Sequence, residues 1–146
     1  MHPDFRDLLS EFTARGVEFL VVGAHALAAH GHVRATKDLD LWIRRTRGNA
    51  ARVHEALASF GAPLGELTVA DLTVVGLIFQ IGVEPVRIDI INEIDGVDFD
   101  DAWPDRVEAD VDGLIVPLLS RRHLIQNKRA SGRLQDLADL ERLEEL

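Results

Sequence analysis

Apolar and polar positions follow two spacings along this chain, and the spacings predict two kinds of element. A recurrence every three or four residues is typical of a helix with one buried face, and a recurrence every two is typical of a half-buried strand. Apolar spacing, alanine content and a Ser120 cap predict helices at residues 5–12, 24–30, 53–60, 120–128 and 134–143. Strands are predicted at residues 17–22, 38–43, 77–81 and 86–91, with a hairpin over residues 107–117.

The order of these elements predicts an α+β fold built on a mixed β-sheet. Successive side chains of a strand point to opposite faces, so the polar positions show which face is open. Asp38, Asp40 and Asp89 fall on one face of their strands. The apolar positions on the other face are Leu39, Leu41, Val86, Ile88 and Ile90. We therefore expect the helices to pack on one face of the sheet and the aspartates to lie on the other.

The length and composition predict a single domain without a membrane segment. A chain of 146 residues can bury a core, and we expect one domain over residues 1–146 with the helices of residues 120–146 packed on it. The chain has no cysteine, which excludes disulfides and thiolate metal sites and fits a reducing cytosol. It shows neither a bilayer-spanning apolar run nor a signal peptide, so we expect a cytoplasmic protein.

The charge is unevenly distributed. The formal net charge is −9, and residues 84–112 alone hold eleven acids and two arginines, whereas residues 120–133 hold five cations and no acid. A chain of this net charge is a poor general binder of nucleic acid, although the basic stretch can contact phosphates locally. The simplest interpretation of the acidic stretch is solvated surface.

Three aspartates carry the strongest chemical signal. Asp38 and Asp40 are two residues apart on one strand, and Asp89 joins them if its strand lies alongside. Three carboxylates this close repel one another, and divalent metal relieves the repulsion. Two Mg²⁺ ions held in this way can activate a hydroxyl and stabilise a leaving pyrophosphate. The alternatives are an exposed strand face for the pair and, for Asp89, an ion pair with Arg87 or another nearby cation.

A glycine turn precedes the acid pair. The predicted strand ends at Gly23 and a short helix begins at Ala24, which leaves free backbone N–H groups that attract phosphate. Arg34, Thr36 and Lys37 follow and can help to neutralise a triphosphate. The alternative is a tight turn without a ligand.

These motifs, taken in order, resemble the nucleotidyltransferase superfamily of the DNA polymerase β type. Gly23–Ala24 matches its glycine signature, Asp38 and Asp40 match its acid pair, and Asp89 matches its third acid. The sequence Gly-Ala-x-Ala-Leu-Ala-x-His-Gly, followed by Arg-x-Thr-x-Asp-Leu-Asp, is most similar to small bacterial nucleotidyltransferase-like proteins. Many of these are linked to toxin–antitoxin and phage-defence systems of the abortive-infection type.

The resemblance implies a nucleotidyltransferase fold and a metal-dependent reaction. A nucleoside monophosphate would pass from a nucleoside triphosphate to an acceptor hydroxyl, with two Mg²⁺ ions, or Mn²⁺, held by Asp38, Asp40 and Asp89. The residues implied to bind the nucleotide are Gly23, Ala24, Arg34, Thr36 and Lys128. The acceptor is left open among tRNA, a protein and a small molecule, and a small helical partner protein is implied by the toxin–antitoxin link.

The C-terminal pattern Lys…Arg…Asp-x-x-Asp is similar to the ending of the same group. It implies a phosphate contact for Lys128, while Arg133, Asp136 and Asp139 would hold the last helix in place. Ala24 departs from the pattern, because many active members carry Ser or Gly there, and no acceptor domain is visible. Two alternatives therefore stand beside the enzyme: a binding module that acts as an antitoxin or partner subunit, and a phosphate-binding regulator without a transfer step.

Overall fold

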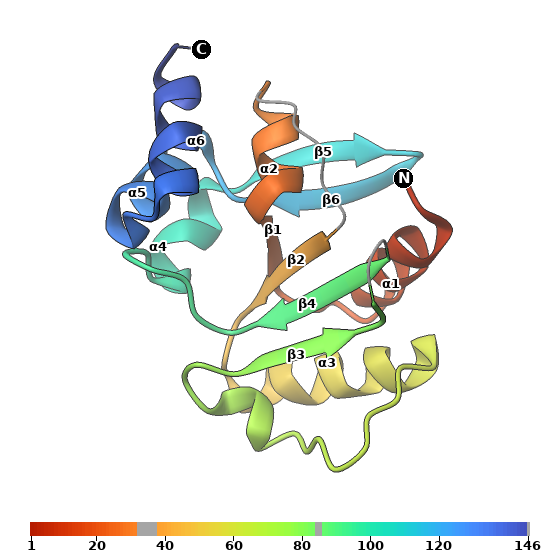
Figure 1. Cartoon of the computed structure of the whole chain (residues 1–146). Helices are drawn as coiled ribbons and strands as arrows, with labels where there is room; N and C mark the ends of the chain where they lie inside the picture. The colour runs from red at the N-terminus through yellow and green to blue at the C-terminus, as the bar shows by residue number, and fades with distance from the viewer. Residues whose placement is uncertain (32–37, 84–85, 146) are drawn as a thin grey trace.

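The computed structural model describes residues 1–31, 38–83 and 86–145, and it confirms the predicted α+β class (Figure 1). Among these residues the α-helices are α1 (Pro3–Ala14), α2 (Gly23–Ala29), α3 (Arg47–Phe60), α4 (Phe99–Ala102), α5 (Arg121–Ser131) and α6 (Leu134–Glu145). The strands are β1 (Phe19–Val22), β2 (Asp38–Ile43), β3 (Ile78–Ile81), β4 (Arg87–Ile91), β5 (Val107–Val111) and β6 (Leu114–Leu118). Short 3₁₀ turns cover Asp71–Thr73 and Trp103–Asp105.

Two differences from the predicted elements have local causes. The helix α3 begins six residues earlier than predicted, because the Thr46 side chain caps it by accepting a hydrogen bond from the Asn49 N–H. The residue pattern does not predict α4, since four residues are too few to show a helical spacing. The hairpin turn is confirmed: Asp112 and Gly113 have φ values of 53° and 83°, as a primed two-residue turn requires.

The strands form one mixed sheet, which within the described residues has six strands in the order β3-β4-β2-β1-β6-β5. The central strand β2 runs parallel to β4 and antiparallel to β1, and β1 in turn runs parallel to β6. The outer strands β3 and β5 are each antiparallel to their neighbour. The parallel β2–β4 pair therefore brings together the two chain segments that carry the aspartates.

The helices α1 and α3 cover one face of the sheet (Figure 1). Leu39 and Leu41 of β2 and Ile88 of β4 are almost fully buried in this core, as the alternation predicts. Phe12 of α1 meets Phe19 of β1 edge-on, with the ring centroids 5.1 Å apart. Burial of these side chains is the main favourable contribution to folding on this face.

A second core on the opposite face corrects the expectation that the helices pack on one face only. The helices α2, α4, α5 and α6 contribute to it, and it covers β1 and the end of β2. Trp42 lies on the same face as the acid pair, yet it is only 2% exposed and packs edge-on against Phe99, with ring centroids 5.0 Å apart. The second core therefore leaves the beginning of β2 and β4, where the aspartates lie, uncovered on this face, and the edge strand β3 beside them is open as well.

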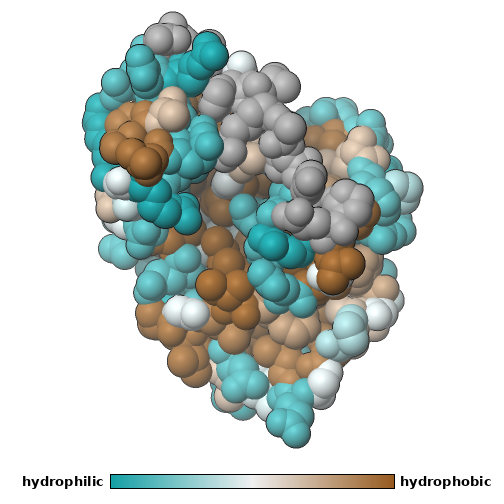
Figure 2. Space-filling model, in the orientation of Figure 1, coloured by the Kyte–Doolittle hydropathy of each residue, from teal (hydrophilic) through white to brown (hydrophobic). Residues whose placement is uncertain are grey.

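Exposed apolar side chains gather near the outer edge of the sheet at β3. Val74, Val75 and Ile78 are 61%, 53% and 66% exposed, and Figure 2 shows hydrophobic surface over this lower part of the molecule. The exposure follows from the position of β3 as an edge strand. In the described ranges, no helix is both long and apolar enough to cross a membrane.

Candidate functional site

The three predicted aspartates lie together where β2 and β4 run side by side. The register of this parallel pair places Asp38 opposite Arg87 and Asp40 opposite Asp89. Because residues two apart on a strand share a face, the four side chains form a square block on the open part of the sheet. Asp89 is 8% exposed, and Asp38 and Asp40 are half-buried.

Arg87 is the cation of this block. Its Nη2 donates to Asp38 Oδ2 at 2.8 Å and to Asp89 Oδ2 at 3.2 Å, so one nitrogen holds a carboxylate from each strand. The ion pair considered as the alternative role of Asp89 is therefore present. This ion pair does not exclude the metal-site prediction, because the three aspartates are still grouped together around it.

The carboxyl of Asp40 lies next to that of Asp89. Burial and then the charges of Asp89 and Asp38 raise the pKa of Asp40 to about 6, while Arg87 lowers it only in part. One oxygen of Asp89, Oδ1, is buried and has no hydrogen-bond partner among the described residues. The Asp40–Asp89 pair is thus short of compensating positive charge, and such a pair attracts a cation.

The donor set of the block fits a hard divalent cation. Mg²⁺ prefers oxygen ligands and is usually held by one or two carboxylates together with phosphate oxygens, which matches the adjacent carboxyls of Asp40 and Asp89. As the side chains lie, no three carboxylate or imidazole groups in the described part of the chain are arranged to hold one ion. Asp38, which would be the third ligand, is instead bound to Arg87.

The glycine turn approaches the acids more closely than the sequence pattern indicates. Gly23 begins α2 with a φ of 68°, in the left-handed region that favours glycine. The β1–β2 register pairs the preceding Val22 with Asp40, and a Cβ at Gly23 would overlap Asp40 Oδ2. Glycine is therefore needed here for a steric reason as well as for its backbone conformation.

Of the other residues expected at the glycine turn and after it, the structure describes only Ala24. Ala24 follows Gly23 at the beginning of α2 and is half-buried. Arg34 and Thr36, together with Lys37, lie outside the described residues. The structure therefore places the glycine turn beside the acids and gives no position for these three side chains.

Lys128 has a different environment from the one implied by the resemblance. It is 5% exposed, and its Nζ lies 2.9 Å from Asp136 Oδ1 and 3.4 Å from Asp139 Oδ2. Burial opposes ionisation of Asp136, but hydrogen bonds from Arg133, Ser131 and Lys128 outweigh it and lower the pKa of Asp136 to about 2. The ammonium group joins α5 to α6, and its carboxylate partners take the place expected for phosphate.

Arg133 is a candidate that sequence reasoning assigned only to the support of α6. Its guanidinium donates to Asp136 Oδ2 at 2.6 Å, and its side chain is 78% exposed. The hydrogen bond and charge of Asp136 raise the pKa of Arg133, and the charges of Asp95 and Asp40 add to this effect. An exposed cation therefore lies within electrostatic reach of the acid block, and the basic stretch of residues 120–133 was its signal in the sequence.

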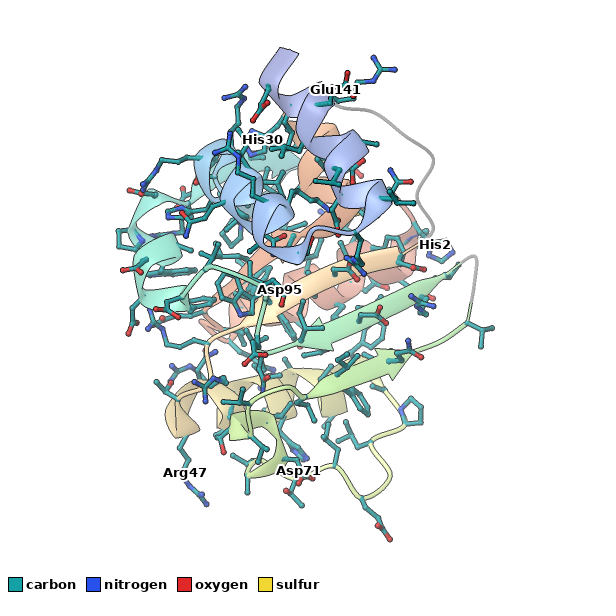
Figure 3. The ribbon with its side chains drawn as sticks, turned by 60° about the vertical axis from the view of Figure 1, so that its left-hand side comes forward. His2, His30, Arg47, Asp71, Asp95 and Glu141 are labelled. Atoms are coloured by element: carbon teal, nitrogen blue, oxygen red, sulfur yellow. The ribbon has the colours of Figure 1, made fainter. Side chains whose placement is uncertain are left out.

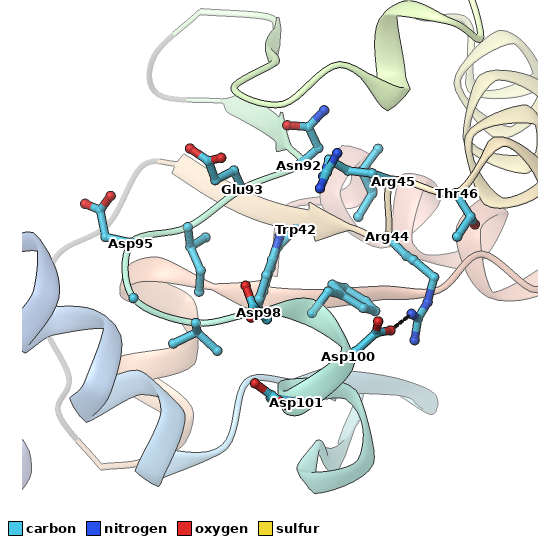
Figure 4. Close-up of a pocket in the computed structure, with 15 residues that line it drawn as sticks. Trp42, Arg44, Arg45, Thr46, Asn92, Glu93, Asp95, Asp98, Asp100 and Asp101 are labelled. Atoms are coloured by element: carbon cyan, nitrogen blue, oxygen red, sulfur yellow. Dashed lines mark hydrogen bonds and ion pairs between the residues drawn. The ribbon is translucent and has the colours of Figure 1, made fainter.

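A pocket of about 730 Å³ opens beyond the acid block, at the carboxyl ends of β2 and β4. Trp42, which follows Asp40 by two residues on the same face, forms part of its wall. Figure 4 shows the contact between Arg44 and Asp100 at one end of the pocket and Glu93 with Asp95 at the other. The acids that line it are Glu93, Asp95, Asp98, Asp100 and Asp101.

Helix α5 holds the loop that carries several of these acids. The side chains of Gln126 and Asn127 donate to the carbonyl oxygens of Gly96 and Asp95, at 2.6 and 3.0 Å. A Cβ at Gly96 would overlap that of Ala130, so glycine allows the helix to come this close. Figure 3 shows Asp95 on this loop, between the sheet and α5.

Comparison with known proteins relates the whole chain to one family. The model of a family described as "Nucleotidyl transferase of unknown function (DUF2204)" matches residues 2–146. No curated protein matches the chain. A Thermotoga maritima protein, TM1012, classed as a nucleotidyltransferase, has a similar structure, with a TM-score of 0.63, 15% identity, and coverage of 97% of this chain and 91% of its own.

Two antibiotic-modifying enzymes also share the fold. The lincosamide adenylyltransferase LnuA, solved with lincomycin bound, matches with a TM-score of 0.61 and 13% identity over 99% of this chain and 96% of its own. ANT(2")-Ia, in complex with adenylyl-2"-tobramycin, matches with a TM-score of 0.62 and 15% identity over 95% of this chain and 84% of its own. At this identity the likeness shows a common fold.

Proposed function

The chain belongs to the family of nucleotidyl transferases of unknown function, and on this premise we propose how its site transfers a nucleotide. The observation that carries the proposal is the block of Asp38, Asp40 and Asp89, with the Gly23 turn packed directly against Asp40. In the proposed reaction an acceptor hydroxyl attacks the α-phosphorus of a nucleoside triphosphate. The bond to pyrophosphate breaks, and the acceptor keeps the nucleoside monophosphate.

The three aspartates are the proposed holders of divalent metal, with two Mg²⁺ ions expected and Mn²⁺ as a substitute. Asp38 and Asp40 would help to hold both ions, and Asp89 would help to hold the catalytic one. When bound, the ions neutralise charge on the triphosphate and make the hydroxyl more acidic. Asp89 Oδ1, which has no hydrogen-bond partner among the described residues, is the proposed acceptor of the hydroxyl proton.

Nucleotide binding is proposed on the side of the glycine turn. The backbone N–H groups at Gly23 and Ala24, in the turn packed against Asp40, would bind phosphate oxygens, and Arg34 and Thr36 remain proposed contacts. Arg133 is a better candidate than Lys128 for a further phosphate contact. Both cations contact Asp136, but the Arg133 side chain is 78% exposed, whereas Lys128 is buried between Asp136 and Asp139. Arginine can also bind phosphate with two parallel hydrogen bonds.

The acidic pocket is proposed as the acceptor side of the site. Its five acids disfavour a triphosphate, and its two arginines, Arg44 and Arg45, compensate for them only in part. A volume of about 730 Å³ is in the range of small-molecule pockets. The acceptor we propose is therefore a small hydroxyl compound, in preference to tRNA or a protein. The antibiotic acceptors of LnuA and ANT(2")-Ia are examples of this class.

Transfer can be tested with nucleoside triphosphates labelled at the α-phosphate. The purified protein is incubated with each nucleotide, Mg²⁺ and a small-molecule extract, and label transfer and pyrophosphate release are measured. We expect Asp89→Asn to lower the rate by about 100-fold or more, because the group supports charge that develops in the transition state. The matched control is Glu66→Gln, at an exposed acid outside the site. An Asp89→Asn variant as active as the parent would contradict the proposal.

A second candidate function is a catalytically weak or inactive binding module with the same fold, which acts as an antitoxin or partner subunit. Ala24 favours it, because the hydroxyl that many active members carry at this position is missing. The same experiment separates the two functions. A pure binding module neither retains the triphosphate nor releases pyrophosphate, and a phosphate-binding regulator retains the triphosphate without releasing pyrophosphate. The enzyme releases pyrophosphate together with the labelled product.

A further inference from the structure

Arg87 occupies the centre of the acid block. One nitrogen, Nη2, lies within hydrogen-bond distance of an oxygen from Asp38 on β2 and an oxygen from Asp89 on β4. The two carboxylates are diagonal neighbours in the β2–β4 register. A cation shared by these two oxygens would lie at the point that this nitrogen takes.

The charge balance of the block depends on this arginine. Three carboxylates face one guanidinium, and a guanidinium remains charged at every physiological pH. Without Arg87, the carboxylates of Asp38 and Asp89 would repel each other and that of Asp40 across a partly buried surface. Arg87 therefore neutralises part of the carboxylate charge, as a bound metal ion would.

We propose that Arg87 is an internal counter-ion that competes with metal for Asp38 and Asp89, and that the triphosphate draws it away when nucleotide and metal bind together. This inference rests on the proposed function. The Arg87 side chain is 29% exposed, so the protein does not fully enclose it. Phosphate oxygens offer the guanidinium an equivalent anionic partner, with the geometry for two hydrogen bonds.

The competition makes metal and nucleotide binding mutually dependent. A bare metal ion must displace Arg87 without offering it a new partner, so its affinity is reduced. A metal ion that arrives with a triphosphate provides that partner, so each ligand strengthens the binding of the other. Coupling of this kind typically changes an affinity by about 5- to 150-fold, and it is reciprocal.

The test is calorimetric titration of Mn²⁺ into the full chain, with and without a non-hydrolysable triphosphate. We expect Arg87→Met to bind Mn²⁺ about tenfold more tightly than the parent in the absence of nucleotide and to lose most of the enhancement that nucleotide gives the parent. In the presence of a metal chelator, Arg87→Met should melt at a lower temperature than the parent. Addition of Mn²⁺ should raise the melting temperature of the variant and remove this difference. Arg87→Lys, which keeps the charge, should resemble the parent.

A control and a second variant keep the test decisive. Arg122→Met removes an arginine that pairs with Asp105 outside the site, and it should leave Mn²⁺ binding unchanged. If Arg87→Met does not fold, Arg87→Gln keeps hydrogen-bond donors without the charge and should show the same tighter binding.

The failure of this inference is distinguishable from failure of the proposed function. If Arg87→Met, or Arg87→Gln in its place, binds Mn²⁺ no more tightly than the parent while Asp89→Asn abolishes binding, the metal site stands and the competition by Arg87 is refuted. If the parent and both Arg87 variants bind no metal even with triphosphate, the metal site itself is refuted, and the inference with it.

Discussion

At the scale of single residues, Asp40 connects the features of the site. It faces Asp89 across the β2–β4 pair, and it leaves no room for a side chain at Gly23. Its carboxyl is consequently buried among like charges, which favours the protonated form in the folded protein. The stability of the protein should therefore depend on the protonation of Asp40, and the position of the acids should depend on the absence of a side chain at Gly23.

The first prediction concerns pH. Because burial raises the pKa of Asp40 to about 6, its contribution to stability is complete at acid pH, below the pKa of an unfolded aspartate, and is lost as pH rises through about 6. In the presence of a metal chelator, the free energy of unfolding of the parent should fall by roughly 2 to 3 kcal/mol between pH 4 and pH 7 because of Asp40. Asp40→Asn lacks this loss, so it should be the more stable protein at pH 7.

Urea denaturation of the parent and of Asp40→Asn across this pH range measures the effect. All other titrating groups are common to the two proteins, so the difference between the two curves reports the titration of Asp40 together with its effect on Asp38 and Asp89. A difference in unfolding free energy that stays constant between pH 4 and pH 7 would show that the carboxyl titrates normally.

The second prediction concerns Gly23. Gly23→Ala and Gly16→Ala place a side chain at nearly equal positive φ, 68° and 67°, and each should cost about 1 kcal/mol of backbone strain. Only Gly23→Ala overlaps Asp40, since nothing lies within 4 Å of a Cβ at Gly16. Gly23→Ala should therefore be less stable than Gly16→Ala by about 1 to 3 kcal/mol.

Misplacement of Asp40 should also lower the transfer rate of Gly23→Ala by about 100-fold, while Gly16→Ala keeps the parent rate. Urea denaturation gives the stabilities, and pyrophosphate release gives the rates. Equal stability and equal rates for the two variants would mean that the turn does not position the acid.

At the scale of elements, the pairing of α5 with α6 rests on a buried ion cluster. Lys128 of α5 lies between Asp136 and Asp139 of α6, and all three are at most 5% exposed. Removal of one partner from such a cluster leaves an uncompensated buried charge, which is more costly than the loss of a surface ion pair. The end of the chain therefore depends on Lys128 for its attachment.

The third prediction follows from this cluster. Lys128→Met should lower the free energy of unfolding by about 3 to 5 kcal/mol, because the ammonium group buried between Asp136 and Asp139 is lost. Arg129→Met breaks the exposed pair with Glu144 and should cost less than about 1 kcal/mol. Urea denaturation compares them. A Lys128→Met variant with parental stability and weaker triphosphate binding would support the phosphate contact that the resemblance implies.

At the scale of the whole molecule, two cores on opposite faces of the sheet determine where the site can lie. The core under α1 and α3 spans β1, β2 and β4, whereas the core under α2, α4, α5 and α6 stops at Trp42. The acid block begins where this second core ends. The acidic pocket lies beyond Trp42, so the fold places an anionic and partly enclosed space at one side of the block and the glycine turn at another.

Local patterns predicted most elements of this fold, because the spacing of apolar residues reports directly on which side chains are buried. The residue pattern located β2 to the residue, and it identified the Asp112–Gly113 turn. It could not predict the second core, because the helical residues that pack there on the sheet come from four helices that are far apart in the sequence. Lys128 likewise belongs to the basic stretch of residues 120–133, and the local pattern does not show that α6 buries it.

The sequence by itself determined the α+β class, the strands that carry Asp38, Asp40 and Asp89, and the face on which these side chains lie, because strand alternation is a property of the local backbone. Only the tertiary structure decided which residues meet. The parallel register of β2 and β4 places Arg87 among the acids, and the turn of β1 into α2 places Gly23 against Asp40. Such contacts depend on strand order and register, which neighbouring residues in the chain do not specify.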